Sequence, residues 1–187
     1  MSEFPDHPFW DYSLNVYMKP GVGAACLELQ DAHQLDVNIV LFCSWVGASG
    51  RGVMEQAEMA AAVEAVDAWH HDVVHALRAV RTRMKGGMPP APDDIAESLR
   101  QRIQKVEIDC EHMEQLMLAG TIDRPADEAR ALADRASDAA ANIARYFAQM
   151  GRTASPRDCE NLAVILRVAF PDVPPDDVAR IGAAIAS

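Results

Sequence analysis

The ten residues from 37 to 46 constrain the fold more than any other segment. Eight of them are apolar, and only Asn38 and Ser44 are polar. The run is about half as long as a helix that spans a bilayer, so it belongs in a protein core. A helix that is apolar on all sides must be surrounded by other helices. A strand is the alternative, because the run has β-branched residues. Helical patterns on both sides, and Gly47 just past the run, favour a central helix.

Helical patterns fill most of the remaining chain, separated by Pro and Gly. The predicted helices cover residues 8–18, 22–33, 37–46, 54–85 and 93–119, followed by helices that begin at Pro125 and Pro156 and a last short helix near residues 178–185. Asp36 and Ser155 are predicted N-caps. We therefore predict an all-α fold. It is a compact bundle of seven to eight helices, in which the fourth and fifth form a long antiparallel hairpin.

The fifth predicted helix carries apolar residues at near-heptad spacing. We expect this stripe to be its buried face: Ile95, Leu99, Val106, Cys110, Met113 and Met117. Charged residues then lie on its solvent side.

The charge balance excludes some partners. The net charge is −11, and residues 1–77 hold eleven acids and only two bases. Such a chain repels nucleic acid and anionic lipid surfaces, so we expect neither as a partner.

The four cysteines form no Cys-x-x-Cys pair, which is typical of reduced, shielded thiols. With no signal-peptide pattern at residues 1–6, the sequence predicts a cytoplasmic protein.

Two blocks of residues carry a family resemblance. The first contains Phe9-Trp10, Pro20-Gly21-Val22, Ala25-Cys26-Leu27, Asp36-Val37-Asn38 and Leu41-Phe42-x-x-Trp45-x-Gly47. The second contains Trp69, Val73-Val74, Leu77-Arg78, Arg81, Lys85 and the helix from Glu107 to Leu118. Over residues 9–120 the chain resembles a bacterial family of unknown function, whose members are conserved hypothetical proteins of about this size. The resemblance implies no activity, cofactor or catalytic residue. It suggests a core at residues 1–120 and a helical extension at 121–187, packed on the same bundle.

Histidines and carboxylates gather on the predicted hairpin. The spacing Asp-x-x-His occurs at 67–70, 72–75 and 109–112, which is similar to the ligand spacing of di-iron helical bundles. Antiparallel pairing of the fourth and fifth helices would bring the part of this cluster on one helix to the same level as the part on the other. The ligands of this metal-binding alternative are Asp67, His70, His71, Glu107 and Glu111. The helical wheel instead favours a solvated face of paired charges.

Basic residues gather at the end of the fourth helix. Arg78, Arg81 and Lys85 share one helical face, and Arg102 lies near them in the predicted hairpin. We predict that these four form a contact surface for an anionic protein partner. Alternatively, they complement the negative end of the helix dipole.

A pocket is the last possibility. Its candidate lining residues are Trp10, Tyr17, Asn38 and Trp45. No serine or cysteine pairs with a histidine in a recognisable catalytic order, and no phosphate-binding glycine motif is present. The sequence therefore favours a non-catalytic protein-interaction module or adaptor, without a cofactor or catalytic residue. A metal-binding protein or metalloenzyme and a small-molecule binder are the alternatives.

Overall fold

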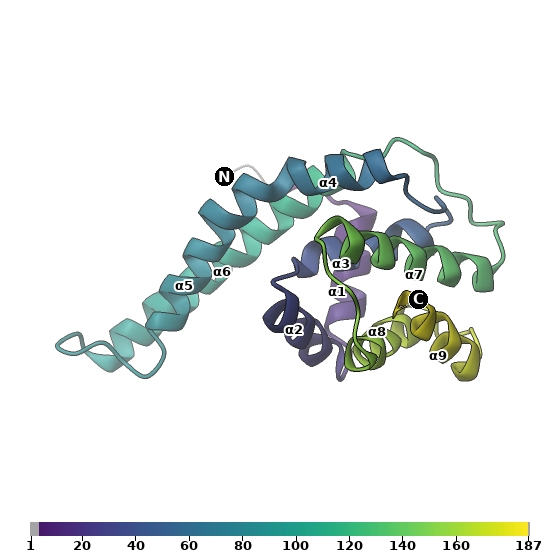
Figure 1. Ribbon diagram of the computed structural model, residues 1–187. Helices are drawn as coiled ribbons and strands as arrows, with labels where there is room; N and C mark the ends of the chain where they lie inside the picture. Colours follow the sequence, from purple (N-terminus) through teal and green to yellow (C-terminus); the bar gives the residue numbers. More distant parts are fainter. Residues whose placement is uncertain (1–3, 187) are drawn as a thin grey trace.

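A computed structural model describes residues 4–186, and this part of the chain contains helices and no strand (Figure 1). The helices are α1 (Pro8–Tyr17), α2 (Val22–His33), α3 (Val37–Ala48), α4 (Gln56–Trp69), the π-helix η1 (His70–Val74), α5 (His75–Arg83), α6 (Asp93–Ala119), α7 (Leu132–Gln149), α8 (Pro156–Ala169), α9 (Pro175–Ala183) and the 3₁₀-helix η2 (Ala184–Ala186). Because α4, η1 and α5 follow one another without a break, they form one long helix. The predicted all-α bundle and its long hairpin are confirmed.

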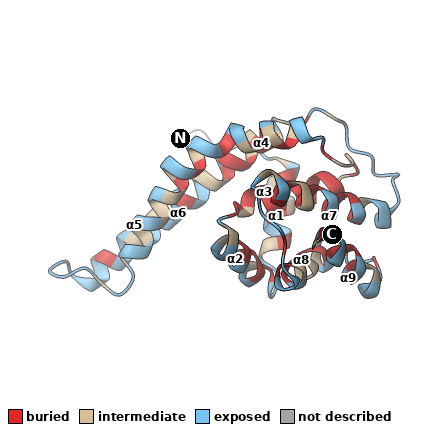
Figure 2. Cartoon of the chain, viewed as in Figure 1, coloured by how far each residue is buried: buried red, intermediate tan, exposed pale blue. Residues whose placement is uncertain are grey.

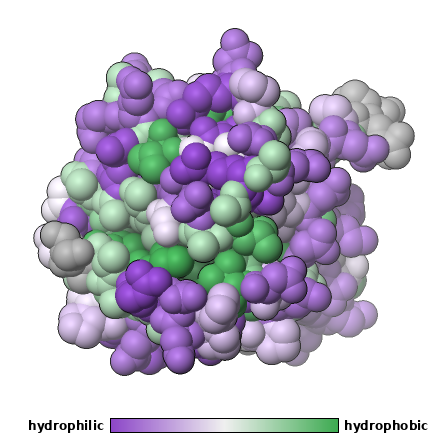
Figure 3. Space-filling model, turned by 90° about the vertical axis from the view of Figure 1, so that its right-hand side faces the viewer, coloured by the Kyte–Doolittle hydropathy of each residue, from purple (hydrophilic) through white to green (hydrophobic). Residues whose placement is uncertain are grey.

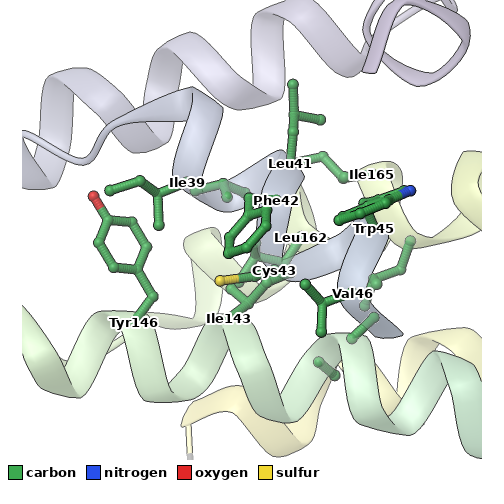
Figure 4. Close-up of a cluster of buried hydrophobic side chains, with 14 of the residues drawn as sticks. Ile39, Leu41, Phe42, Cys43, Trp45, Val46, Ile143, Tyr146, Leu162 and Ile165 are labelled. Carbon is green, nitrogen blue, oxygen red and sulfur yellow. The ribbon is translucent and has the colours of Figure 1, made fainter. Parts of the chain in front are cut away.

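Helix α3 lies at the centre, as its composition predicts. All its residues from 38 to 48 are buried. Figure 4 shows Phe42 and Cys43 close to Ile143 of α7 and Leu162 of α8. The side chain of Asp36 accepts a hydrogen bond from the backbone N–H of Asn38 at 2.8 Å, so Asp36 is the N-cap of this helix. The polar cap of a fully buried helix is itself buried.

Gly47 lies inside α3 and not beyond its end, which corrects the predicted boundary. A Cβ atom at Gly47 would lie 2.5 Å from the Cα and 2.7 Å from the Cβ of Ala139 in α7. The glycine therefore lets the backbones of α3 and α7 touch. Its role is close helix packing, and it does not end the helix.

The predicted buried stripe of α6 is wrong over the outer part of the helix. Ile95, Leu99 and Val106 are 62%, 46% and 49% exposed. The hairpin of α5 and α6 projects from the body, and solvent surrounds its tip (Figures 1 and 2). The apolar face there is therefore exposed to solvent. The buried residues of α6 are instead mostly polar: Ala96, Glu107, His112, Glu114, Gln115 and Leu118.

The segment before α7 is not helical from Pro125, as the sequence suggested; α7 begins at Leu132. Arg124 Nη1 donates to the carbonyl of Val53 at 3.1 Å, and the N–H of Asp127 donates to the carbonyl of Ser49 at 3.0 Å. These bonds hold the segment against the loop after α3, and they replace the hydrogen bonds that a helix would supply.

Several surface properties follow from the helix arrangement. No helix within residues 4–186 is long and apolar enough to cross a membrane. Cys26 and Cys43 are buried, whereas Cys110 and Cys159 are only half-buried, so the expected shielding of the thiols is incomplete. On the face at the right-hand side of Figure 1, apolar residues gather near the centre among polar ones (Figure 3).

Helix α8 begins with the predicted capping box and is tied to α2. Asp158 Oδ2 accepts from the N–H of Ser155 at 2.7 Å, and the Asp158 N–H donates to Ser155 Oγ at 3.2 Å. The same carboxylate contacts His33 Nε2 of α2 at 2.8 Å. One buried side chain therefore caps a helix and joins two helices.

Replacing Asp158 by Asn should lower the free energy of unfolding by about 1–2 kcal/mol at neutral pH, because the capping carboxylate is lost. Burial raises the pKa of Asp158, but hydrogen bonds from Ser155 and the contact with His33 outweigh it and lower the pKa. A carboxyl group with a depressed folded-state pKa stabilises the fold above its unfolded pKa, near 3.9. The difference between wild type and Asp158→Asn, measured by urea unfolding, should shrink as the pH falls below about 4. A pH-independent difference would contradict this explanation.

Candidate buried polar site

Buried polar side chains line the inner side of α6, where an apolar seam was expected. Glu107, Glu114 and Gln115 are 4%, 0% and 4% exposed. A buried carboxylate is unfavourable unless it is paired or hydrogen-bonded. Each of these residues contacts a partner. Together with their partners they form two neighbouring clusters along the inner side of α6.

The first is the arginine cluster, formed by Gln30, Arg78, Arg81, Glu107 and Glu111. Glu107 accepts from Arg78 Nε and from Arg81 Nη2, both at 3.0 Å. Arg78 also donates to Glu111 at 2.6 Å and to Gln30 at 2.8 Å. Burial raises the pKa of Glu107, but the two guanidinium groups outweigh it and lower the pKa. The cluster clamps α5 to α6.

The second is the buried triad of Asp36, His70 and Glu114. His70 Nδ1 lies 2.9 Å from Glu114 Oε1 and 3.1 Å from Asp36 Oδ2. All three residues are buried, and one potential ligand atom from each lies within 4.8 Å of the other two. Asp36 Oδ1 caps α3. Asp36 Oδ2 has the ion-pair contact with His70 but no hydrogen bond.

The triad shifts the pKa values of its members. Burial lowers the pKa of His70, but the two carboxylates outweigh it and raise the pKa to about 10. Burial, with Asp36 nearby, raises the pKa of Glu114 to about 8. Burial also opposes ionisation of Asp36, but His70 outweighs it and lowers the pKa. The triad therefore favours a charged imidazole, and Glu114 gives up its proton less readily than Asp36 does.

The π-helix η1 places His70 in this cluster. The N–H of His75 donates to the carbonyl of His70, five residues earlier. In a regular α-helix His70 and Arg78 would lie about 80° apart around the axis, and one inserted residue brings them within about 20°. Both side chains consequently face α6. Such π-turns often occur at functional sites.

A cavity of about 190 Å³ lies between α1, α2, α3 and α6, beside the triad. Its walls are mainly apolar and include Trp10, Leu14, Tyr17, Met18, Leu27, Val37, Leu41 and Ile108. Its polar side is formed by Ser13, Gln30, Asp36, Asn38, Arg78, Glu111 and Gln115. The buried atoms Ser13 Oγ and Gln115 Oε1 have no hydrogen-bond partner among residues 4–186.

Two amides connect the triad to the cavity. Asn38 Nδ2 donates to Glu114 Oε2 at 3.1 Å, and Gln115 Nε2 donates to Asn38 Oδ1 at 2.8 Å. Because Glu114 Oε2 accepts from the Asn38 amide, that amide is oriented, and through it the Gln115 amide. Gln115 lines the cavity, and its Oε1 is left without a hydrogen-bond partner within residues 4–186.

Three of the four predicted pocket residues, Trp10, Tyr17 and Asn38, line this cavity. Trp45 does not. It packs against Phe9, with ring centroids 5.2 Å apart, and is 5% exposed.

The five predicted metal ligands do not come together. Only His70 belongs to the triad. Asp67 and His71 form an exposed pair, 3.5 Å apart, and Glu107 and Glu111 bind Arg78. The predicted docking residues also divide. Arg78 and Arg81 belong to the arginine cluster, whereas Lys85 and Arg102 are exposed.

The sequence interpretation missed Ser13, Asp36, Glu114 and Gln115 as site residues. For Glu114 and Gln115 the near-heptad pattern pointed to the wrong face of α6. For Asp36 a signal existed, because the N-cap of a fully buried helix must itself be buried. A buried carboxylate needs a charged or hydrogen-bonding partner.

The fold and the site define an all-α protein with a buried histidine–carboxylate cluster beside a cavity of ligand size. The chain belongs to the family described as "Protein of unknown function (DUF2390)", whose model matches residues 8–118. The resemblance to a family of unknown function is confirmed. The matched region contains the cavity and both clusters, while α7, α8 and α9 lie outside it. No curated protein and no solved structure matches the chain.

Proposed function

We propose that the protein binds a small amphiphilic molecule in the cavity beside the triad. The observation that carries this proposal is that two residues lining an apolar cavity, Ser13 and Gln115, each have a buried polar atom, Oγ and Oε1, without a hydrogen-bond partner within residues 4–186. Leaving a buried polar atom unsatisfied costs about 1–3 kcal/mol. A ligand that hydrogen-bonds to both atoms recovers this energy. Apolar walls with a few convergent polar groups are typical of ligand sites.

The polar side of the cavity selects the ligand's head group. An amide oxygen such as Gln115 Oε1 can only accept a hydrogen bond, so the head group must be a donor. Asp36 and Glu111 add negative charge to the lining. Arg78 already pairs with Glu107 and Glu111 and donates to Gln30, so its charge is balanced within the protein. An ammonium group fits best.

The size and walls of the cavity select the rest of the ligand. A dry cavity of about 150 Å³ holds benzene, and this cavity measures about 190 Å³. Trp10 and Tyr17 offer aromatic faces, which attract both apolar groups and cations. The proposed ligand is thus a primary amine with one ring or a short alkyl chain.

Calorimetric titration with 2-phenylethylamine should show one binding site, whereas 3-phenylpropionate, of similar size but opposite charge, should not bind. Gln115→Leu should weaken binding of the amine by about tenfold or more, since one hydrogen bond to a charged group contributes about 1.5–3 kcal/mol.

Two exposed leucines supply a matched control. Leu14, 42% exposed, lines the cavity, and Leu132, 43% exposed, does not. Leu14→Ala should weaken the amine and Leu132→Ala should not. Equal affinity for both ligands, or equal losses in the two leucine variants, would contradict the proposal.

A protein-interaction function is the second candidate, and the projecting hairpin favours it. Ile95, Leu99 and Val106 are exposed on α6. We propose that a second copy of the chain covers them, since two antiparallel helix pairs can form a four-helix bundle. A species that stays monomeric at all concentrations in sedimentation equilibrium would contradict this.

The anionic-partner surface stays a prediction, for which Lys85 and Arg102 are the exposed residues.

A further inference from the structure

We propose that Asp36, His70 and Glu114 bind one divalent transition-metal cation, with manganese(II) or iron(II) as the best fit. The ligand atoms would be Asp36 Oδ2, His70 Nδ1 and Glu114 Oε1. This site shares only His70 with the metal ligands that the sequence suggested, which were Asp67, His70, His71, Glu107 and Glu111. It goes beyond the proposed amine binding and can exist without it.

The distances within the triad match an octahedral coordination sphere. Two ligand atoms that lie about 2.1 Å from a cation and about 3 Å apart form an angle of about 90° at the cation. His70 Nδ1 lies 2.9 Å from Glu114 Oε1 and 3.1 Å from Asp36 Oδ2. A tetrahedral zinc site would need wider separations. One imidazole with two carboxylates also suits a transition metal better than calcium or magnesium, which prefer all-oxygen sites.

The unsatisfied oxygen of Asp36 is a second, independent indication. Asp36 is 5% exposed, and its Oδ2 has an ion-pair contact with His70 at 3.1 Å but no geometric hydrogen bond within residues 4–186. The imidazole Nδ1 can carry one hydrogen, and its hydrogen bond goes to Glu114. A cation would give Asp36 Oδ2 a direct bond in addition to its ion-pair contact with His70. The two carboxylates would also balance its double positive charge within a buried site.

The surroundings of the triad hold its carboxylates in place. Glu114 Oε2 accepts from Asn38 Nδ2, and Asp36 Oδ1 accepts from the backbone N–H of Asn38 at 2.8 Å. Such outer partners orient metal ligands and tune their affinity. Asp36, His70 and Tyr146 also line a hollow of about 30 Å³. That is room for a water molecule. Three protein ligands with an open position are typical of sites where the metal also binds water or substrate.

The primary experiment is a titration of the full-length, metal-free protein with manganese(II), followed by the electron paramagnetic resonance signal of the unbound ion. We expect one equivalent to bind. Glu114→Gln should weaken binding by about 100-fold or more, because it replaces a charged ligand that lies in the first coordination sphere. His71→Gln is the matched control, since His71 is next to His70 in the chain but its side chain is 62% exposed. This variant should bind manganese(II) as wild type does.

A measurement on the wild-type protein covers the case in which Glu114→Gln does not fold. Electron spin echo spectra of the manganese(II) complex should show coupling to one histidine nitrogen, and this coupling should persist in His71→Gln. Bound manganese(II) without histidine coupling would overturn the proposal. Failure of both manganese(II) and iron(II) to bind would also overturn the proposal. The triad would then be a group of ionisable side chains that share protons without a metal. Loss of binding in His71→Gln would move the site to the exposed pair and would equally refute the proposal. Amine binding to the metal-free protein is measured separately, so either proposal can fail alone.

Discussion

Replacing Gly47 by alanine should destabilise the protein by about 3 kcal/mol or more, although alanine is the better helix former by about 1 kcal/mol. The new Cβ would overlap the Cα and Cβ of Ala139, at 2.5 and 2.7 Å. These atoms belong to the backbone and first side-chain carbon of α7, so no rotamer change removes the clash. Helices α3 and α7 would have to separate. Their interface contains much of the core, including Ile143, which is fully buried.

The matched control is Gly23→Ala in α2. Its Cβ would lie 3.6 Å from the ring of Tyr17, an ordinary contact. This variant should be neutral or more stable by up to about 1 kcal/mol. Urea denaturation followed by circular dichroism measures both changes. A Gly47→Ala protein as stable as wild type would show that α3 and α7 do not touch at this point.

Replacing Glu107 by alanine should destabilise the protein by about 2–3 kcal/mol, because a buried partner of two arginines is removed. Glu107 is 4% exposed, and without it Arg78 and Arg81 lose their shared acceptor. The side chains of both arginines are partly exposed, 25% and 18%, so solvent offsets part of the loss. The effect is therefore smaller than for a fully buried ion pair.

The control for this prediction is Glu97→Ala, also on α6. Glu97 pairs with Arg100 near the tip of the hairpin, and its side chain is 49% exposed. Exposed ion pairs contribute little, so the urea midpoint should hardly change. Limited proteolysis should also cut the hairpin faster in Glu107→Ala than in wild type. If the two glutamate variants behave alike, the arginine cluster does not hold the hairpin together.

The predicted docking residues should differ in how much their charge reversal affects stability. Reversing the charge of Arg78 or Arg81 should loosen the hairpin, because each binds Glu107. Lys85 and Arg102 are exposed, so their reversal leaves stability intact and tests the anionic-partner surface alone.

Local signals in the sequence were enough to predict several elements of the fold. The apolar run from 37 to 46, with helical patterns on both sides, predicts the central helix, because a helix that is apolar on all sides must be surrounded by other helices. Asp36 and Ser155 predict two helix starts, since capping depends on a side chain and a backbone N–H a few residues away. The breaks at Pro20-Gly21 and at 86–92 separate helices for equally local reasons.

Other features depended on which segments become neighbours, and the sequence could not predict them. Periodicity shows which face of α6 is apolar, but not whether another helix covers it. The hairpin leaves the body, so Ile95 and Leu99 are exposed. A glycine such as Gly47 can either end a helix or allow a close contact between helices. Only the position of Ala139 shows that the second applies here.

The buried site shows the same division between local and tertiary information. The sequence by itself determined that the chain is helical, where its central helix lies and that Asp36 caps it. Only the tertiary structure decided that Asp36 meets His70 and Glu114, because these residues come from three separate segments. Their meeting also requires the extra residue of the π-turn, which rotates His70 toward α6. Hydrogen bonds along a helix are local, whereas a buried charge is paired by whatever the fold brings beside it.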